Sequence, residues 1–373
     1  MYPLKKRSFL VSSMTVILLL AACSDSNTRE AEDEKNNTEE TQQNETKDTS
    51  KKKDEDEKKS SQPYKALQPS EDAKPLKQKL SEKELKNMPE SQTEGVDNSK
   101  RSVPVGQMLV KGADDQTDGP LKNNRLVAFY GHPNSENMGI LGEMEPEAMM
   151  EKLKKQTQAY SDADPERPAI PTIELITTVA QRDPGPNGKF YRMTPEEDIE
   201  KYAKLAEKNN ALLLLDIQLG TDSVMNQVKL IEKWLKLPYV HLAIDTEFRV
   251  EEGEVPGEDL GQVDGKEVQE AVEYLSEIVG KNDLPDKFVL VHQFTDGVLT
   301  NKDAVQPTDN VEVALNFDGW GASRDKQTLY RKFVRDDTSQ YGGFKIFYNK
   351  DEPVLKPMDV VKLDPGPAIV NYQ

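Results

Sequence analysis

From residue 124 onward, short apolar runs alternate with longer stretches of helical period, and this alternation constrains the fold most strongly. The apolar runs are rich in β-branched residues, which is typical of strands buried on both faces. Eight runs follow one another, at residues 126–130, 173–179, 212–217, 240–246, 288–294, 311–317, 343–348 and 368–372. The stretches between them predict helices at residues 145–160, 194–209, 223–235, 266–279 and 325–334.

Eight buried strands alternating with helices indicate an α/β protein with a parallel sheet closed into a (β/α)8 TIM-like barrel. The alternative is an open doubly wound sheet, which usually has fewer strands and a phosphate-binding glycine loop after the first one. The glycines after the first run, at positions 131, 139 and 142, fit neither a dinucleotide fingerprint nor a P-loop. The pattern therefore favours the barrel and gives no sign of a nucleotide cofactor.

The amino terminus has the pattern of an export signal. Basic residues at positions 5–7 precede a mostly apolar segment at residues 9–20, which is too short to span a membrane. Leu-Ala-Ala-Cys at residues 20–23 resembles the lipobox of bacterial lipoproteins, in which the cysteine is acylated and becomes the new amino terminus. We expect a signal peptide at residues 1–22, a lipid on Cys23 and a location on the extracytoplasmic side of the cell membrane. The alternative is a transmembrane anchor.

Cys23 is the one cysteine of the chain, so the domain that follows can have neither a disulfide, nor a thiolate metal site, nor a cysteine nucleophile. Residues 24–124 are mostly charged or polar, with few large apolar side chains. Such a segment buries too little apolar area to offset the entropy of ordering. We expect residues 23–124 to be a lipidated, disordered tether, with a binding tail as the alternative, and residues 125–373 to be the barrel domain.

The net charge of the chain is -18, which argues against a nucleic-acid partner because phosphate binding needs a basic surface. No segment after the leader is apolar enough to span a membrane. The expected partners are the membrane, through the lipid at Cys23, and a glycan of the cell wall or the environment.

The fourth apolar run ends with two carboxylates that share a face. Side chains alternate along a strand, so Asp245 and Glu247 should both point into the barrel mouth, with Cβ atoms about 6.5–7 Å apart. Two like charges in a partly desolvated cleft should not ionise independently, and one is expected to keep its proton near neutral pH. Such a pair suits acid catalysis. The alternative is that both are solvated or paired near Arg249.

Polar side chains also close the other runs, which packing alone does not explain. These candidate substrate-binding residues are Tyr130, His132, Glu174, Asp216, Gln218, His292, Gln293, Asp318 and Tyr348, and Lys345 lies in the same run as Tyr348. Trp320, beside two glycines, is a candidate for stacking on a ligand, with an exposed hydrophobic anchor as the alternative. Because barrels carry their chemistry at the carboxyl ends of their strands, we expect one polar pocket there.

Two histidines and a carboxylate could in principle hold zinc. His132 and His292 are not spaced locally as a ligand pair, so we expect no metal and no other cofactor. His241 begins its strand, at the end of the barrel that serves stability, and is interpreted as structural. Trp234 lies in a helical pattern and is interpreted as a core residue.

Asp245-Thr246-Glu247 resembles the Asp-x-Glu signature of the chitinase-like and muramidase-like glycoside hydrolases. The resemblance implies that Glu247 protonates the glycosidic oxygen and that Asp245 orients the acetamido group of the substrate. It implies hydrolysis of N-acetylhexosamine-containing envelope glycans. The rival hypothesis is a non-catalytic module that binds a glycan or a protein, and a weaker third one is a metal-dependent hydrolase.

A second resemblance extends over the whole domain. Five short segments are similar to an uncharacterised family of secreted, lipid-anchored TIM-barrel proteins of Gram-positive bacteria. They lie at residues 130–133, 138–143, 245–249, 291–294 and 347–351. This resemblance implies architecture and location, and no established activity comes with it.

Overall fold

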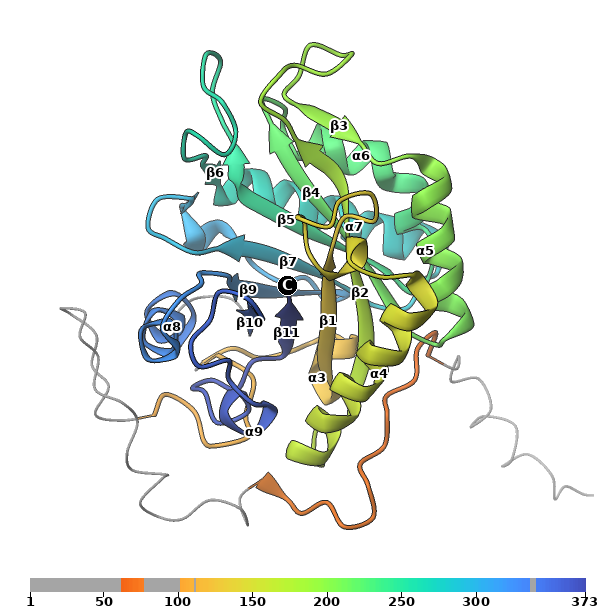
Figure 1. Cartoon of the computed structure of the whole chain (residues 1–373), viewed down its shortest axis with the longest axis vertical. Coiled ribbons are helices and arrows are strands. Elements are labelled where there is room, and N and C mark those ends of the chain that lie inside the picture. Colours follow the sequence, from red (N-terminus) through yellow and green to blue (C-terminus); the bar gives the residue numbers. More distant parts are fainter. Residues whose placement is uncertain (1–61, 77–100, 111, 336–339) are drawn as a thin grey trace, which may run out of the picture. The chain divides into compact units, whose positions relative to one another are not determined.

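The structure is a computed structural model that describes residues 62–76, 101–110, 112–335 and 340–373 (Figure 1). The predicted signal peptide, Cys23 and most of the predicted tether lie outside the described residues, and those predictions are not tested by the structure. Among the described residues, no helix combines the length and the apolarity needed to cross a membrane.

Eight parallel strands form a closed barrel (Figure 1). The strands are β1 (Arg125–Gly131), β2 (Ala169–Ala180), β4 (Leu212–Gly220), β5 (Val240–Arg249), β7 (Lys287–Gln293), β9 (Val311–Phe317), β10 (Tyr341–Ile346) and β11 (Ile369–Tyr372). Each strand pairs in parallel with the next one in this order. The ring closes because β11 pairs with β1, with Leu126 opposite Ile369. The predicted (β/α)8 barrel is confirmed, and each strand overlaps one of the eight apolar runs.

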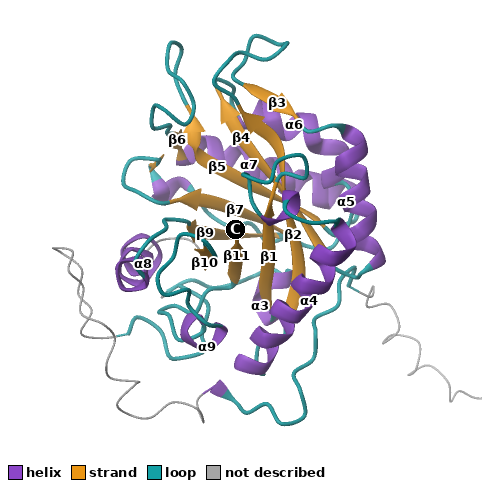
Figure 2. Ribbon diagram, viewed as in Figure 1, coloured by secondary structure: helices purple, strands orange, loops and turns teal. Residues whose placement is uncertain are grey.

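Helices lie between successive strands and cover the outside of the barrel (Figure 2). They are α4 (Pro146–Ala163), α5 (Glu196–Lys208), α6 (Val224–Leu235), α7 (Gly265–Asn282), α8 (Ser323–Tyr330) with the π-helical turn Arg331–Arg335, and the short α9 (Pro357–Val360). The five longer helices coincide with the five predicted ones. Two have side-chain caps, in which Ser223 accepts from the Asn226 amide and Asp264 from the Lys266 amide.

Short elements complete the domain. They are α3 (Pro120–Asn123), β3 (Tyr191–Met193), β6 (Val263–Asp264), β8 (Leu299–Thr300) and the 3-10 turns Ile140–Gly142 and Lys302–Ala304. Strand β3 pairs antiparallel with β2, and β6 pairs with β8. Between β7 and β9 the chain forms only β8 and one 3-10 turn, so the fifth unit of the barrel has no α-helix.

The barrel core is apolar on both faces of the strands. In β4 every residue is buried, and the run Leu212–Gly220 reads as four leucines followed by alternating polar and apolar side chains. Complete burial of a leucine or valine side chain is worth roughly 1.5–3 kcal/mol. This burial explains why the continuously apolar runs form strands. It does not account for the polar residues in the carboxyl half of β4.

The domain begins earlier than predicted, because two stretches assigned to the tether pack against the barrel. Residues 62–76 run along its amino end, where the Leu67 amide donates to the Ala169 carbonyl at 2.8 Å and the Ser70 hydroxyl bonds Asp162. Residues 101–110 and 112–124 approach the starts of other strands, and Leu109 forms a bridge with Tyr341. The prediction of disorder up to residue 124 is therefore wrong for these stretches.

The physical reason is a sparse set of apolar side chains. The buried members are Leu76, Val103, Val105, Met108, Val110 and Leu121. They are separated by polar residues, glycine and proline, so they show neither helical nor strand periodicity. The segment covers a surface that the barrel leaves open instead of folding by itself.

Candidate functional site

A pocket opens at the carboxyl end of the barrel strands, with a volume of about 290 Å³. We call it the mouth pocket. It is lined by Tyr130, Asn137, Met138, Ile176, Gln218, Asp245, Glu247, Phe248, Phe294, Asp318, Trp320, Lys345, Phe347, Lys350 and Gln373. Its volume is near the lower end of the range for small-ligand sites. Six of the predicted site residues are in this lining.

Asp245 and Glu247 both line the mouth pocket, as their alternation along β5 predicted. Burial raises the pKa of Glu247 to about 7, with the charge of Asp318 adding to the effect. Burial also raises the pKa of Asp245 well above its usual range, and the neighbouring Asp216 and Glu247 raise it further. Near neutral pH the pair therefore holds at least one proton.

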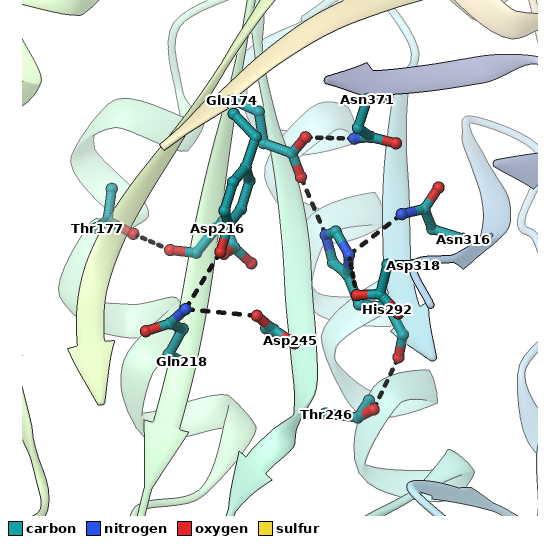
Figure 3. A network of polar contacts seen from close by, with 11 residues as sticks. Glu174, Thr177, Asp216, Gln218, Asp245, Thr246, His292, Asn316, Asp318 and Asn371 are labelled. Carbon is teal, nitrogen blue, oxygen red and sulfur yellow. Dashed lines mark hydrogen bonds and ion pairs between the residues drawn. The ribbon is translucent and has the colours of Figure 1, made fainter. Parts of the chain in front are cut away.

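Beneath this pair, His292 on β7 is held between two carboxylates (Figure 3). Its Nε2 lies 3.0 Å from Glu174 Oε1, and its Nδ1 lies 3.1 Å from Asp318 Oδ2. Burial lowers the pKa of His292, but the hydrogen bonds to Asp318 and Glu174 outweigh burial and raise the pKa well above its ordinary value. The ring is therefore an imidazolium that neutralises part of the acidic cluster.

Two buried amides complete this clamp. The Asn316 side-chain amide lies 3.2 Å from His292 Nδ1, which in an imidazolium is a donor and would need the amide oxygen as its acceptor. Asn371 donates to the second oxygen of Glu174 (Figure 3). Glu174, Asn316 and Asn371 are all fully buried, on β2, β9 and β11. Three distant parts of the sequence thus fix the orientation of one ring.

Asp216 is the exception in this network. Its side chain is fully buried on β4, and neither carboxyl oxygen has a hydrogen-bond partner in the described part of the chain. The Thr177 hydroxyl donates instead to the Asp216 backbone carbonyl, at 2.7 Å. Burial raises the pKa of Asp216 to about 7, and the charge of Glu174 adds to it. An unpaired buried carboxylate is costly, so the group favours its protonated form.

Gln218, two residues further along β4, joins the strands at the pocket floor. Its Nε2 donates to the Tyr130 hydroxyl at 3.2 Å and lies 3.4 Å from Asp245 Oδ2, while its Oε1 accepts from the Ala180 amide (Figure 3). Burial raises the pKa of Tyr130 well above 10, so its hydroxyl stays protonated. This set orients Asp245 relative to β1 and β2.

Cations and aromatic rings form another part of the pocket lining. Lys345 Nζ lies 3.6 Å from the centroid of the Tyr130 ring, and Lys350 Nζ lies 5.5 Å from that of Trp320. Trp320 is 64% exposed and Lys345 only 4%. The prediction that Trp320 lies at the mouth is correct. Lys345 was predicted only as one of the polar residues that close the strands, and Lys350 had no predicted role.

Six predicted site residues do not line the mouth pocket. Glu174, Asp216 and His292 belong to the buried network described above, and the other three lie elsewhere. His132 bonds the Thr194 hydroxyl, with Nε2 to Oγ1 at 3.1 Å. Gln293 faces the helices and donates to the Phe333 carbonyl at 3.2 Å. Tyr348 stacks on Tyr372, with ring centroids 5.0 Å apart. The expectation that all strand-end polar residues share one pocket is wrong for these three, since parity or loop geometry turns them away.

Tyr348 belongs to a separate cavity beside α4, of about 350 Å³. We call it the outer pocket. It is lined by Phe129, Ile140, Glu143, Met144, Lys152, Lys155, Gln156 and Tyr348.

Several residues were missed because their signal was weak. Asn316 and Asn371 are single polar residues inside apolar runs, and Lys345 has the inward parity of its strand but no motif around it. Their common signal is a polar side chain at an inward position of a strand. The predictions for Trp234 and His241 are confirmed, because both are buried and His241 stacks on Phe288 at 4.3 Å.

The described residues contain no group of three or more histidine, cysteine or carboxylate side chains placed to hold a metal ion. His132 and His292 have different partners, so the arrangement needed by a metal-dependent hydrolase is not formed by them. Arg249 pairs with Glu251 and not with the carboxylates of the pocket.

No known protein-family model matches the chain, and no curated protein is significantly similar to it. The two family resemblances drawn from short motifs therefore stay predictions.

Proposed function

We propose that the barrel is a glycoside hydrolase that acts on N-acetylhexosamine-containing glycans, with Glu247 as the general acid. The observation that carries the proposal is the Glu247 carboxyl itself, which lines an accessible pocket and has its pKa raised to about 7. A glycosidic oxygen leaves only when it is protonated, and an acid with a pKa near the working pH transfers a proton most effectively.

Asp245 is proposed to orient the substrate. It lies two residues before Glu247, its Oδ2 is 3.4 Å from Gln218 Nε2, and its Oδ1 has no partner in the described part of the chain. Because its pKa is well raised, a protonated Asp245 could donate to the carbonyl of an acetamido group or, once ionised, accept from its N–H. Trp320 offers its exposed ring to the apolar face of a sugar.

Accessibility of the pocket supports an enzyme. The loop after β1 contributes Asn137 and Met138 to the wall, while the exposed Trp320 and Lys350 stand at the rim. Gly139 has φ +92°, and a Cβ there would meet the Tyr130 carbonyl oxygen at 2.4 Å. Glycine at this position therefore lets the loop pack closely against the end of β1.

The test is hydrolysis of purified peptidoglycan and chitin oligomers by the full chain and by Glu247→Gln. We expect the substitution to reduce the rate by about 10²–10⁴-fold, because removal of a general acid has that effect. Glu252→Gln, which changes an exposed carboxylate a few residues away, is the matched control and should keep full activity. Hydrolysis retained by folded Glu247→Gln would remove the proposed acid.

Glycan binding without hydrolysis by the wild-type chain would instead favour the rival function, a non-catalytic glycan-binding lipoprotein. The distinction needs both measurements on the same preparation. The two functions share the mouth pocket and differ only in whether Glu247 transfers a proton.

We also propose that Cys23 anchors the protein by a lipid to the extracytoplasmic face of the cell membrane. The Leu-Ala-Ala-Cys motif at residues 20–23 supports this location. Labelled palmitate should enter the wild-type protein and not Cys23→Ser, and the variant should leave the membrane fraction. Labelling of Cys23→Ser would contradict the proposal.

A further inference from the structure

The buried lysines of the described chain differ in how their ammonium groups are satisfied. Lys287 donates to the carbonyls of Leu237 and Val240, at 2.8 and 2.7 Å. Lys326 donates to the Lys345 carbonyl and pairs with Asp351. Lys345 is equally buried, yet the hydrogen bonds and ion pairs found in the described part of the chain include none to its Nζ. An ammonium group in such a place needs an acceptor.

The surroundings of Lys345 are aromatic and open toward the pocket. Its Nζ lies over the Tyr130 ring and 5.3 Å from the Phe347 ring centroid. Lys350 Nζ lies near the same ring, 5.4 Å from the Phe347 centroid, and 5.5 Å from the centroid of Trp320. Aromatic rings stabilise a cation but do not accept its hydrogen bonds as an anion does. The two ammonium groups therefore leave room for an anionic ligand.

The charge of Lys345 acts on Asp216 and Glu247 and lowers their pKa values, but no carboxyl group of the described residues forms an ion pair with it. Glu174 and Asp318 are held by His292. The other three, Asp216, Asp245 and Glu247, have raised pKa values and are largely protonated in mildly acidic solution.

We infer that the mouth pocket selects a sugar that carries a carboxylate, which accepts hydrogen bonds from Lys345 and is attracted by Lys350 at the rim. The inference rests on the glycan-binding part of the proposed function and not on hydrolysis. The carboxylate occupies the cationic side of the pocket, the sugar ring lies near Trp320, and Asp245 and Glu247 face the rest of the sugar. A charge-assisted hydrogen bond is stronger than one between neutral groups.

The test compares two probes that differ by one acidic group. N-acetylmuramic acid carries a lactyl ether with a carboxylate, and N-acetylglucosamine lacks it. We would titrate each into full-length Glu247→Gln by calorimetry, since the absent acid prevents turnover. The acidic sugar should bind on the order of tenfold more tightly or better. The preference should weaken with salt and strengthen as the pH falls from 8 to 6, because Asp216 takes up a proton in this range.

Lysine variants then locate the effect. Lys345→Met should abolish the preference and Lys350→Met should reduce it, whereas Lys345→Arg should keep it. Lys155→Met, in the outer pocket, removes the same net charge away from the site and is the matched control. Because Lys350 is exposed, its variant tests the idea even where Lys345→Met fails to fold.

Two results would overturn the inference. One is equal or tighter binding of the neutral sugar, and the other is an undiminished preference in folded Lys345→Met. Acid-selective binding by a chain that hydrolyses nothing would leave the inference standing and defeat only the proposed hydrolysis. Hydrolysis of neutral chitin oligomers with no preference for the acidic sugar would support the proposed hydrolysis and overturn the inference.

Discussion

At the amino end of the barrel, buried charged groups have partners, whereas at the carboxyl end some have none. Arg125, at the start of β1, donates to Asp164 at 3.1 Å and to the Pro367 carbonyl at 2.8 Å. The fully buried Glu312 accepts from the amides of Leu121 and Lys122, at 3.1 and 3.0 Å. The segments before β1 close this end.

Charged groups at the carboxyl end are buried as deeply, but some of them have no hydrogen-bond or ion-pair partner. Neither oxygen of Asp216 has a partner in the described residues, and no hydrogen bond or ion pair found there reaches the ammonium group of Lys345. At the amino end, Arg125 Nη2 and Asp164 Oδ1 also lack partners, but the two groups bond each other through their other atoms. Lys345 lines the mouth pocket. The comparison teaches that burial alone does not mark a functional residue. A stronger indication is a buried charged group that has no partner at any of its atoms.

The largest expected effect comes from removing one partner of the buried ion pair at the amino end of the barrel. Arg125→Met leaves Asp164 buried opposite an apolar side chain, and we expect the free energy of unfolding to fall by about 3–5 kcal/mol. Urea denaturation would measure the loss. The double variant Arg125→Met with Asp164→Leu should recover most of it, because no charge remains unpaired. A single variant as stable as the wild type would show that this end does not depend on its ion pair.

Removing the charge of Asp216 at the carboxyl end should instead increase the free energy of unfolding. Asp216 has a pKa of about 7 in the folded protein against an ordinary value of 3.8. Between about pH 4 and pH 7 the folded state therefore binds the extra proton, and this carboxyl makes the protein less stable as the pH rises. Asp216→Asn removes that loss and should raise the free energy of unfolding by on the order of 2–4 kcal/mol at pH 8.

Unfolding curves at pH 4 and pH 8 would test this prediction, because the gain should nearly vanish at the lower pH. Asp164→Asn at the closed end is the control and should lower stability at both values, since Arg125 loses its partner. An Asp216→Asn variant that is less stable than the wild type at pH 8 would mean that the carboxylate has a partner in solution.

The two ends also differ in how far the sequence could predict them. The eight strands and five main helices were predictable because continuous apolar runs and helical periods are local patterns. The packing of residues 62–76, 101–110 and 112–124 was not, because Val103, Met108 and Leu121 lie in an aperiodic, mostly polar segment. Only the surface of the completed barrel makes their burial favourable.

Within the site, the Asp245 and Glu247 pair was predictable from alternation along one strand. The clamp around His292 was not, since it joins Glu174, Asn316 and Asn371 from three strands. Which strands face each other depends on the closure of the barrel. The same closure places Lys345 over Tyr130, so neither position alone reveals the cationic side of the pocket.

A smaller effect would sharpen the assignment of Glu247. An acid with a pKa of about 7 must be protonated to act, so kcat/KM should fall about tenfold per pH unit above pH 7. The charge of Lys345 lowers the pKa of Glu247, so Lys345→Met should move this alkaline limb to higher pH. The pH profiles of the two proteins would be compared with one neutral chitin oligomer. A profile that stays flat up to pH 9 would contradict the role of Glu247.

The smallest expected effects are those of replacing two exposed aromatic residues, one in each pocket. Trp320 is 64% exposed at the mouth pocket, so Trp320→Ala should change the free energy of unfolding by no more than about 0.5 kcal/mol while weakening glycan binding by about three- to tenfold. Tyr348 is 40% exposed in the outer pocket and stacks on Tyr372, so Tyr348→Ala should cost about 0.5–1.5 kcal/mol of stability and leave binding unchanged. Glycan binding by calorimetry and unfolding in urea, measured for both variants, would test whether one substitution affects mainly binding and the other mainly stability. Equal effects on binding would mean that the sugar extends from the mouth pocket to the outer pocket.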